Sequence, residues 1–329
     1  MRRVLLALLI AGLGVFCGLS PVARAGTPPD DALAWLARIT TASQRLNYVG
    51  TFSYQVGQRS ETSRIVHRFS HGLESERLEV LDGSPREVLR RGGELRCILP
   101  EQRTVIVSRV EDRRTLPGRL PQDFASLVNN YRVRIGEVTR VADHDARVVI
   151  IEPLDDLRFG HVLWAEVRSG LLLKSRLLAP GGAVVEQFSF SDVQIGEEID
   201  DRLLAPRAQP GPGWRVVEAV RRPGVQVERY WRLKMPLPGF TLVSVAYRVR
   251  EQGGNVTHMV FSDGLASISV FIEPVDDRRE AGRTGASSSG VVSVYERVVG
   301  DQRLTVLGEV PAQAVAQLAA AIELGRGHE

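Results

Sequence analysis

Short runs in which apolar and polar side chains alternate cover most of this 329-residue chain. Residues 48–54 (YVGTFSY) are a clear example, and turn signals such as Asp82-Gly83 and Gly181-Gly182 separate the runs. Alternation with a period of two is typical of β-strands that bury one face, and Asp-Gly or Gly-Gly pairs favour tight turns between antiparallel neighbours. The pattern therefore predicts antiparallel sheets rather than a helical core.

The first part of the chain carries most of these runs and one long helical pattern. Strands are predicted at residues 48–54, 63–69, 78–81, 86–90, 94–99, 104–110, 131–141, 146–152, 161–167, 171–178 and 183–195. Residues 30–46 have apolar side chains at helical spacing, with Asp30 or Asp31 as N-cap, and residues 124–128 form a second, short helical pattern. We predict an α+β, β-rich fold in which a large curved antiparallel sheet wraps the long helix against its concave face.

A segment rich in proline and glycine, residues 204–213 (LAPRAQPGPG), divides the chain. It is predicted to be a linker between a domain at residues 26–203 and a smaller α+β domain at residues 214–325. In the smaller domain, strands are predicted at residues 241–250, 255–262, 266–273, 291–298 and 302–308, followed by a helix at residues 311–324 that begins with proline. The polar, Ser/Gly-rich residues 276–290 are predicted to be a mobile loop.

Residues 1–25 have the features of a secretory signal peptide. Two arginines precede an apolar run at residues 4–19, and Ala23-Arg24-Ala25 offers small residues at the two positions that signal peptidase reads. Cleavage after Ala25 is therefore predicted. A retained membrane anchor is less favoured because the run is short for a bilayer span of about 20 residues. A lipid-modified Cys17 is also less favoured, because the bulky Phe16 stands where lipidation requires a small residue.

Export changes the charge of the protein. Residues 1–25 hold three of the 42 basic residues and no acidic one, so the mature chain has 39 residues of each sign and is nearly neutral. A neutral chain without a basic stripe interleaved with aromatic residues is not predicted to bind nucleic acid. Cys97 is the one cysteine of the mature chain, which excludes an intramolecular disulfide.

No catalytic or metal-binding motif stands out in the sequence. The six histidines form no HExxH pattern, and His67 and His71 fall on a predicted strand and turn, where four-residue spacing does not give a shared helical face. Asp155-Asp156 and Asp276-Asp277 are adjacent pairs, interpreted as solvated turn acids because neighbours on a strand point to opposite faces. Ser262-Asp263-Gly264 lacks the Gly-x-Ser-x-Gly pattern of a hydrolase. We predict that the chain is not an enzyme and has no metal or cofactor.

The curved sheet instead offers an apolar interior. Apolar residues on its strands could line a cavity for a lipid between the sheet and the helix. The candidate lipid-binding residues are Tyr48, Phe52, Tyr54, Phe69, Leu163 and Leu172. The alternative interpretation is that each is an ordinary core residue.

Several segments, in order along the chain, resemble one protein family. They include residues 47–52 (NYVGTF), residues 237–240 (LPGF), residues 307–311 (LGEVP) and, as the most specific, residues 262–274 (SDGLASISVFIEP). Over essentially the whole mature chain these segments resemble the MucB/RseB family, the periplasmic regulators of the envelope-stress sigma factor (sigma-E or AlgU type).

The resemblance implies both a fold and a function. The larger domain is expected to be a half-open barrel similar to lipoprotein carriers (LolA-like). Family members bind the periplasmic region of a membrane-spanning anti-sigma factor (MucA/RseA-like), shield it from the site-1 protease, and are released by lipid or lipopolysaccharide. The chain is therefore expected to be a negative regulator in the periplasm. A periplasmic carrier of lipids or lipoproteins is the alternative, and the sequence leaves open whether the chain forms a homodimer.

In the family, the smaller domain supplies much of the contact with the partner. The partner-binding candidates chosen there are Phe240, Ser262, Asp263 and Phe271. For Phe240 the alternative is a core anchor of the smaller domain.

Overall fold

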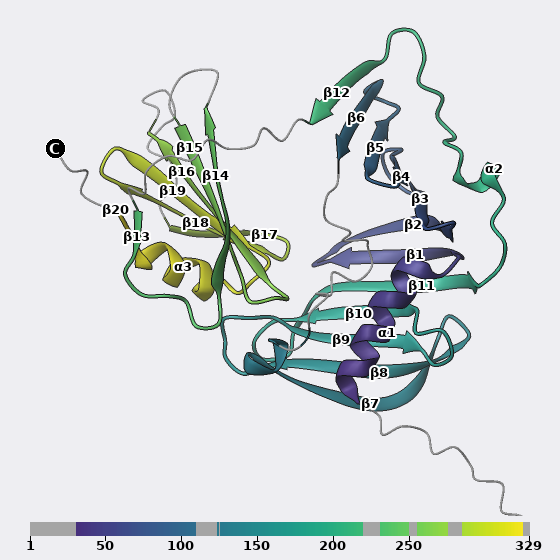
Figure 1. Cartoon of the computed structure of the whole chain (residues 1–329), viewed down its shortest axis with the longest axis horizontal. Helices are drawn as coiled ribbons and strands as arrows, with labels where there is room; N and C mark the ends of the chain where they lie inside the picture. The colour runs from purple at the N-terminus through teal and green to yellow at the C-terminus, as the bar shows by residue number, and fades with distance from the viewer. Residues whose placement is uncertain are drawn as a thin grey trace, which may run out of the picture.

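The computed structural model describes residues 31–109, 124, 126–219, 231–249, 255–275 and 285–324. The predicted signal peptide lies outside these residues. Within these ranges no helix combines the length and the apolar composition that crossing a membrane requires. The described residues form a twelve-stranded sheet, a separate six-stranded sheet and a two-stranded sheet, which confirms the β-rich α+β class (Figure 1).

Helix α1, Ala32–Arg45, opens the described chain and confirms the long helix predicted there. Asp31 caps it, because a side-chain oxygen of Asp31 accepts a hydrogen bond from the Leu33 N–H at 3.0 Å. Trp35, Leu36 and Ile39 are buried on one face of the helix. Figure 1 shows α1 lying across the strands of the large sheet, so its apolar face is covered by that sheet.

The large sheet has the strand order β12-β6-β5-β4-β3-β2-β1-β11-β10-β9-β8-β7. Its strands are β1 Tyr48–Val56, β2 Arg59–Ser70, β3 Leu73–Val80, β4 Glu87–Arg91, β5 Glu94–Leu99, β6 Thr104–Arg109, β7 Tyr131–Val141, β8 His144–Pro153, β9 Gly160–Glu166, β10 Leu172–Leu178, β11 Val184–Ile195 and β12 Arg215–Ala219. Neighbours are antiparallel except for β12 and β6, which run parallel. The sheet bends, so that β3 to β6 turn away from the plane of β7 to β11 (Figure 1). Before β7, the short helix η1, Leu127–Asn129, overlaps the end of the predicted helix at residues 124–128.

The segment predicted to be a linker lies along the large sheet. Helix α2, Asp201–Leu204, leads into it. The Glu87 carboxylate on β4 then accepts hydrogen bonds from the backbone N–H groups of Arg207 at 2.9 Å and Ala208 at 2.8 Å. Arg77 on β3 donates to the Leu203 carbonyl at 2.9 Å. Although its composition is typical of a flexible linker, this segment is thus held in place by buried charged side chains of the sheet.

Strand β12 differs from the predicted domain boundary at residue 214. It pairs with β6, and the Arg215 N–H donates to the Arg103 carbonyl at 2.8 Å. Without β12, the edge of β6 would present unpaired backbone groups, which natural sheets cover or disguise. Residues 215–219 therefore belong to the large sheet rather than to the smaller domain.

The six-stranded sheet has the order β14-β15-β16-β19-β18-β17 and is antiparallel throughout. Its elements are β14 Thr241–Val249, β15 Asn255–Ser262, β16 Ser267–Pro274, β17 Gly285–Ser289, β18 Val292–Val299, β19 Gln302–Gly308 and helix α3 Ala312–Ala321. Ile268, Val270 and Ile272 of β16 are at most 2 % exposed and belong to the same core cluster as Val315 and Leu318 of α3. Alternation on the strands and helical spacing on α3 thus produce one shared core.

Two predicted elements of the smaller domain are corrected. Strand β17 lies inside the predicted loop at residues 276–290, of which residues 276–284 fall outside the described chain. The predicted helix at residues 311–324 ends at Ala321, because the chain continues as β20, Ile322–Leu324, which pairs with β13, Trp231–Leu233. Pro311 occupies the N-cap position. Backbone pairing with a distant strand overrides local helical spacing here.

Candidate functional site

The helix α1 packs against the large sheet, including strands β7, β8 and β10, through one buried cluster. Leu163 on β9 and Leu172 on β10 are 3 % and 1 % exposed and belong to the same cluster as the buried side chains of α1. Both were predicted to bind lipid. The structure places them in a closed core between helix and sheet.

A second cluster joins β1 to β11 through aromatic rings. Tyr48 and Phe52 are 1 % and 5 % exposed. The Phe52 ring lies 4.8 Å from Phe188 and 5.9 Å from Phe190, measured between ring centres. The structure therefore brings two predicted lipid-binding residues together with two phenylalanines that the sequence analysis missed. Alternation in residues 187–191 (QFSFS) was the signal that could have found them.

The remaining two candidates for lipid binding are half-buried. The Tyr54 hydroxyl donates to a Glu186 carboxylate oxygen at 2.7 Å. The backbone N–H of Phe69 donates to Asn47 Oδ1 at 3.0 Å. Tyr54 packs against the margin of the cluster that joins β1 to β11. Phe69 is half-buried and belongs to none of the buried clusters of the described residues.

A buried ionic cluster joins the large sheet to the smaller domain. Its centre is Arg158, in the loop between β8 and β9, whose side chain is fully buried. Arg158 Nε donates to Asp263 Oδ2 at 2.6 Å, and Nη2 donates to the Pro238 carbonyl at 2.7 Å. Arg158 Nη1 donates to Asp155, and the guanidinium carbon lies 4.6 Å from the centre of the Phe240 ring. We name this cluster the interdomain junction, formed by Tyr131, Asp155, Arg158, Pro238, Phe240 and Asp263.

Both oxygens of the Asp263 carboxylate are satisfied. Oδ1 accepts hydrogen bonds from the N–H groups of Leu265 at 2.9 Å and Ala266 at 2.7 Å. Oδ2 accepts from Arg158 and, at 2.9 Å, from the Tyr131 hydroxyl. Burial, and then the negative charge of Asp263, raise the pKa of Tyr131, so the hydroxyl stays protonated and donates. Removing one partner of such a buried ion pair is costly, because it leaves an uncompensated buried charge.

Apolar side chains reinforce the junction from both sides. Leu157, next to Arg158, is 6 % exposed and belongs to the core cluster of the smaller domain. Leu265, next to the Asp263 turn, packs against the cluster beneath α1. Each domain thus inserts a leucine into the core of the other, and this fixes the relative position of the two domains.

The four predicted partner-binding residues fall in two places. Phe240 and Asp263, which are 4 % and 5 % exposed, are part of the interdomain junction. Ser262 and Phe271 are half-buried and lie on the face of the six-stranded sheet opposite α3, because their neighbours Phe261 and Ile272 point into the core. Phe271 stacks on His258 with ring centres 4.3 Å apart.

Arg158 and Tyr131 were not predicted to be site residues. Asp155 was predicted to be a solvated turn acid, whereas its Oδ1 accepts from the Leu157 N–H at 3.0 Å and its other oxygen binds Arg158. An arginine in a short loop after two aspartates gave a weak local signal. Its main partner lies 105 positions along the chain.

One group of described residues could hold a metal ion. His67, Glu74 and Glu76 each offer one ligand atom, and these atoms lie within 4.8 Å of one another. The sequence analysis considered His67 only with His71, and missed the two glutamates that the β2–β3 hairpin brings to it.

Fold and junction define a two-domain, β-rich protein whose large sheet, crossed by one helix, is joined to a small α+β domain by buried charges. Two family models match in the same order. The MucB/RseB N-terminal domain matches residues 31–208, and the MucB/RseB C-terminal domain matches residues 225–323. The chain belongs to the MucB/RseB family.

Relatives in this family are similar over almost their whole length. The sigma factor AlgU regulatory protein MucB of Pseudomonas aeruginosa is 33% identical over 334 residues, covering 98% of each chain. The sigma-E factor regulatory protein RseB of Escherichia coli K12 is 27% identical over 309 residues, covering 91% of this chain and 92% of its own. A crystal structure of MucB in complex with MucA(peri) has 30% identity and a TM-score of 0.69, covering 90% of this chain and 100% of that one. The curated relatives are named as regulators, which points to a regulatory rather than a catalytic family.

Proposed function

We propose that the chain is a periplasmic negative regulator of an envelope-stress sigma factor, which binds the periplasmic region of a membrane-spanning anti-sigma factor. The observation that carries this proposal is the match over both domains to MucB, together with the solved complex of MucB with MucA(peri). In this role the bound chain shields the anti-sigma factor from the site-1 protease, and a lipid or lipopolysaccharide signal releases it.

The partner surface is proposed on the smaller domain, around strand β14. Leu242, Val243 and Val245 of this edge strand are 43 %, 58 % and 40 % exposed. Exposed apolar side chains beside unpaired backbone groups are a typical site for adding a strand or an apolar segment. Thr241 of β14 pairs with Ser262, so the predicted candidate lies next to this edge.

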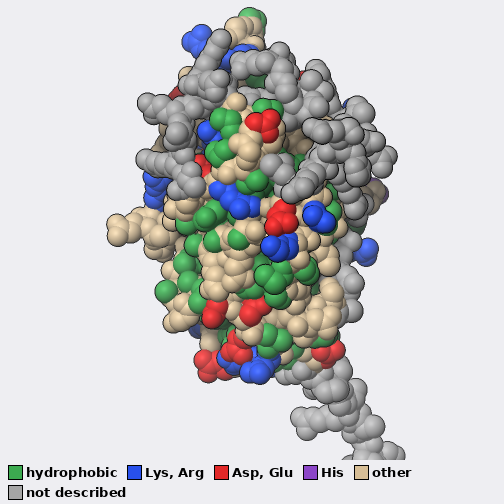
Figure 2. Space-filling view, turned by 90° about the vertical axis from the view of Figure 1, so that its left-hand side faces the viewer, with side chains coloured by type: hydrophobic (Ala, Val, Ile, Leu, Met, Phe, Trp, Pro, Cys, Tyr) green, Lys and Arg blue, Asp and Glu red, His purple; other side chains and the backbone are tan. Residues whose placement is uncertain are grey.

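The predicted partner residues then have different roles in the proposal. Ser262 and Phe271 would contact the partner from the open face of the sheet. Phe240 and Asp263 would act through Arg158, by holding the smaller domain in the position that the partner recognises. The described part of the face in Figure 2 mixes hydrophobic, basic and acidic side chains, which suits a protein partner better than a polyanion.

The lipid site is proposed between α1 and the large sheet. The candidates Tyr48, Phe52, Tyr54, Phe69, Leu163 and Leu172 are its proposed contacts. Because four of them are closed core, an acyl chain would enter by lifting α1 from the sheet. About a dozen buried methylenes contribute roughly 10 kcal/mol before association costs. A protein complex with a micromolar Kd has a binding free energy of about 8 kcal/mol in magnitude. An acyl chain could therefore compete with the partner for the conformation of the chain.

Calorimetry with the mature chain and the periplasmic fragment of its own anti-sigma factor tests the proposal. We expect a 1:1 complex, slower cleavage of the fragment by the site-1 protease, and dissociation when lipopolysaccharide is added. Val243→Lys on β14 should weaken binding, whereas Val298→Lys, on β18 and 48 % exposed, is the matched control and should not. Light scattering of the same samples measures whether the chain is a homodimer.

Absence of any complex, with or without lipopolysaccharide, would contradict the proposal. The carrier alternative predicts a different outcome: the purified chain would move lipoprotein between vesicles without binding the fragment. The match of relatives across the smaller domain favours the regulator, since a carrier has no evident use for that domain.

A further inference from the structure

A row of polar side chains crosses strands β1 to β4 on one face of the large sheet. Tyr48 pairs with His67, His67 with Glu76, and Glu76 with Arg90, each directly across from the next. Residues that pair directly across antiparallel strands point to the same face. The row therefore gathers one imidazole, one phenol, one carboxylate and one guanidinium, and Glu74 joins it two residues before Glu76 on β3.

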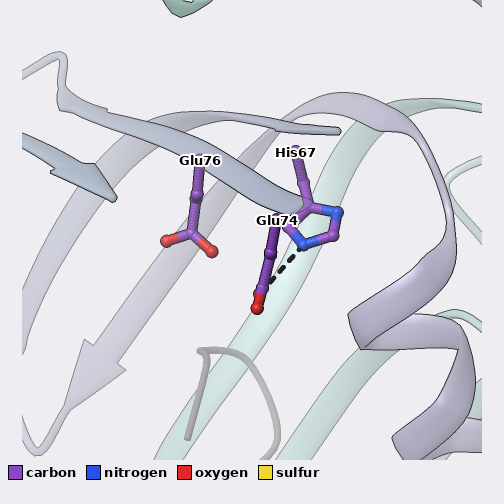
Figure 3. Close-up of side chains that lie close together, drawn as sticks. All are labelled: His67, Glu74 and Glu76. Carbon is purple, nitrogen blue, oxygen red and sulfur yellow. Dashed lines mark hydrogen bonds and ion pairs between the residues drawn. The ribbon is translucent and has the colours of Figure 1, made fainter. Parts of the chain in front are cut away.

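His67 is oriented as a metal-binding histidine usually is. Its side chain is fully buried, and its Nδ1 lies 2.8 Å from the Leu46 carbonyl, just after the end of α1. A carbonyl accepts only, so Nδ1 carries the proton and donates. Nε2 points to Glu74 Oε1 at 3.1 Å, as Figure 3 shows. Holding one ring nitrogen by a backbone carbonyl fixes the other as a ligand, which is the usual support of a histidine bound to metal.

Three polar atoms of this row are buried without a hydrogen-bond partner within the described chain. They are Glu76 Oε2, the Tyr48 hydroxyl and Arg90 Nε, and Tyr48 is only 1 % exposed. The Tyr48 ring stacks on His67 with centres 4.8 Å apart, which brings its hydroxyl to the side of Glu76 and Glu74. Buried polar atoms normally have partners. Two of these three, Glu76 Oε2 and the Tyr48 hydroxyl, have lone pairs that a bound cation can take, whereas Arg90 Nε only donates.

We propose that His67 Nε2, Glu74 and Glu76 bind a divalent transition-metal ion of the zinc class, with the Tyr48 hydroxyl or a water completing the coordination. One imidazole and two carboxylates match zinc better than calcium, which takes six to eight oxygen ligands. The three ligand atoms lie within 4.8 Å, so side-chain rotations bring them around one ion. A bound ion would link the hairpin of β2 and β3 to the end of α1 through His67 and Leu46.

Arg90 gives the proposal its sharpest consequence. Arg90 Nη1 lies 3.3 Å from Glu74 Oε1, so its positive charge competes with a metal ion for the same carboxylate. Removing that charge should strengthen metal binding, while removing a ligand should weaken it. A change that merely damages the fold would weaken binding in both cases.

The test is calorimetric titration of the untagged mature chain with Zn²⁺, together with the absorption spectrum of the Co²⁺ complex. We expect one ion per chain, with Kd raised at least about tenfold in Glu76→Gln and in His67→Asn, since even second-shell losses cost about 10–100-fold. Kd should fall in Arg90→Gln. His71→Asn, exposed in the turn of the same hairpin, is the matched control and should bind as the wild type does.

Circular dichroism melting identifies variants that fail to fold, and the nearly isosteric Glu76→Gln keeps the test decisive if His67→Asn is among them. Absence of saturable Zn²⁺ binding would overturn the proposal. So would binding that Glu76→Gln leaves unchanged, or an Arg90→Gln variant that binds more weakly.

Discussion

Gly239 leaves space for the interdomain junction, because it has no side chain. Its φ of +73° lies in the left-handed region, and the Asn130 side chain and the Arg158 guanidinium occupy the place where a Cβ would stand. Any side chain there would both strain the backbone and push Arg158 away from Asp263. This explains in physical terms why the LPGF segment has a glycine at this position.

Gly239→Ala should therefore lower the free energy of unfolding by more than the cost of placing an alanine in the left-handed backbone region. The matched control is Gly57→Ala, with φ of +57° and nothing within 4 Å of the added methyl. Gly57→Ala should cost roughly 1–2 kcal/mol for the left-handed backbone. Gly239→Ala should add about 1–3 kcal/mol of overpacking. Urea denaturation measures both, and equal losses would contradict this account.

His161 on β9 should make the fold sensitive to acid. Burial lowers its pKa from 6.5 to about 4, although the charge of Asp263 opposes the shift. Between these two values the unfolded chain binds a proton that the folded chain does not, so stability is complete above pH 6.5 and falls towards pH 4. The loss should reach roughly 1–3 kcal/mol.

Urea denaturation of His161→Gln between pH 7 and pH 4 checks this dependence. The variant should lose stability less steeply with acid than the wild type does, while His71→Asn in the exposed turn should keep the wild-type slope. A wild-type slope in His161→Gln would show that other groups cause the acid sensitivity.

At the scale of elements, the sequence predicted most strands because their apolar residues alternate. The strands it missed, β12, β13, β17 and β20, are short or poor in alternation, and each is defined by pairing with a partner strand. Local pattern carries no information about such pairing. For the same reason the Pro/Gly-rich linker could not be recognised as a docked segment, since Glu87 lies 120 positions before Arg207.

Site residues were predictable to a similar degree. Tyr48, Phe52, Leu163 and Leu172, chosen as candidates for lipid binding, lie in the interior because alternation marks the buried face. That they bind lipid stays a prediction. Arg158 was not, because a buried arginine is recognised only when its partners from the other domain are known. Glu76 was missed because its neighbours come from adjacent strands rather than from adjacent sequence.

The docked linker provides a prediction at this scale. In Glu87→Ala, trypsin should cleave the peptide bond after Arg207 at least roughly ten times faster than in the wild type. The reason is that one hydrogen bond to a charged group is worth about 1.5–3 kcal/mol, and Glu87 accepts two from this segment. Mass spectrometry should find two discrete fragments that meet at this bond.

Glu94→Ala is the control, since Glu94 pairs with Arg96 at an exposed site. It should be cleaved at the wild-type rate. Complete digestion of Glu87→Ala without discrete fragments would indicate general unfolding and would contradict the docking role.

At the scale of the whole molecule, the interdomain junction should control how the domains are arranged. Asp263→Ala leaves Arg158 buried without its main partner, a loss of about 3–5 kcal/mol. Small-angle X-ray scattering should show a larger radius of gyration, and thermal unfolding should separate into two transitions. Asp143→Ala, which removes an exposed pair with Arg140, should change neither. An unchanged radius of gyration in Asp263→Ala would mean that the leucine contacts suffice.

The place where β12 leaves the large sheet has one more consequence. The smaller domain follows β12 at one edge of the sheet, whereas the junction lies beside β7 and β8 at the other edge (Figure 1). Residues 220–230 can span at most roughly 40 Å, so a smaller domain released from Arg158 stays on a short tether. Its local concentration near the junction is therefore set by the covalent connection rather than by the protein concentration. Opening should therefore be independent of protein concentration, and the released domain should return to the junction without leaving the molecule.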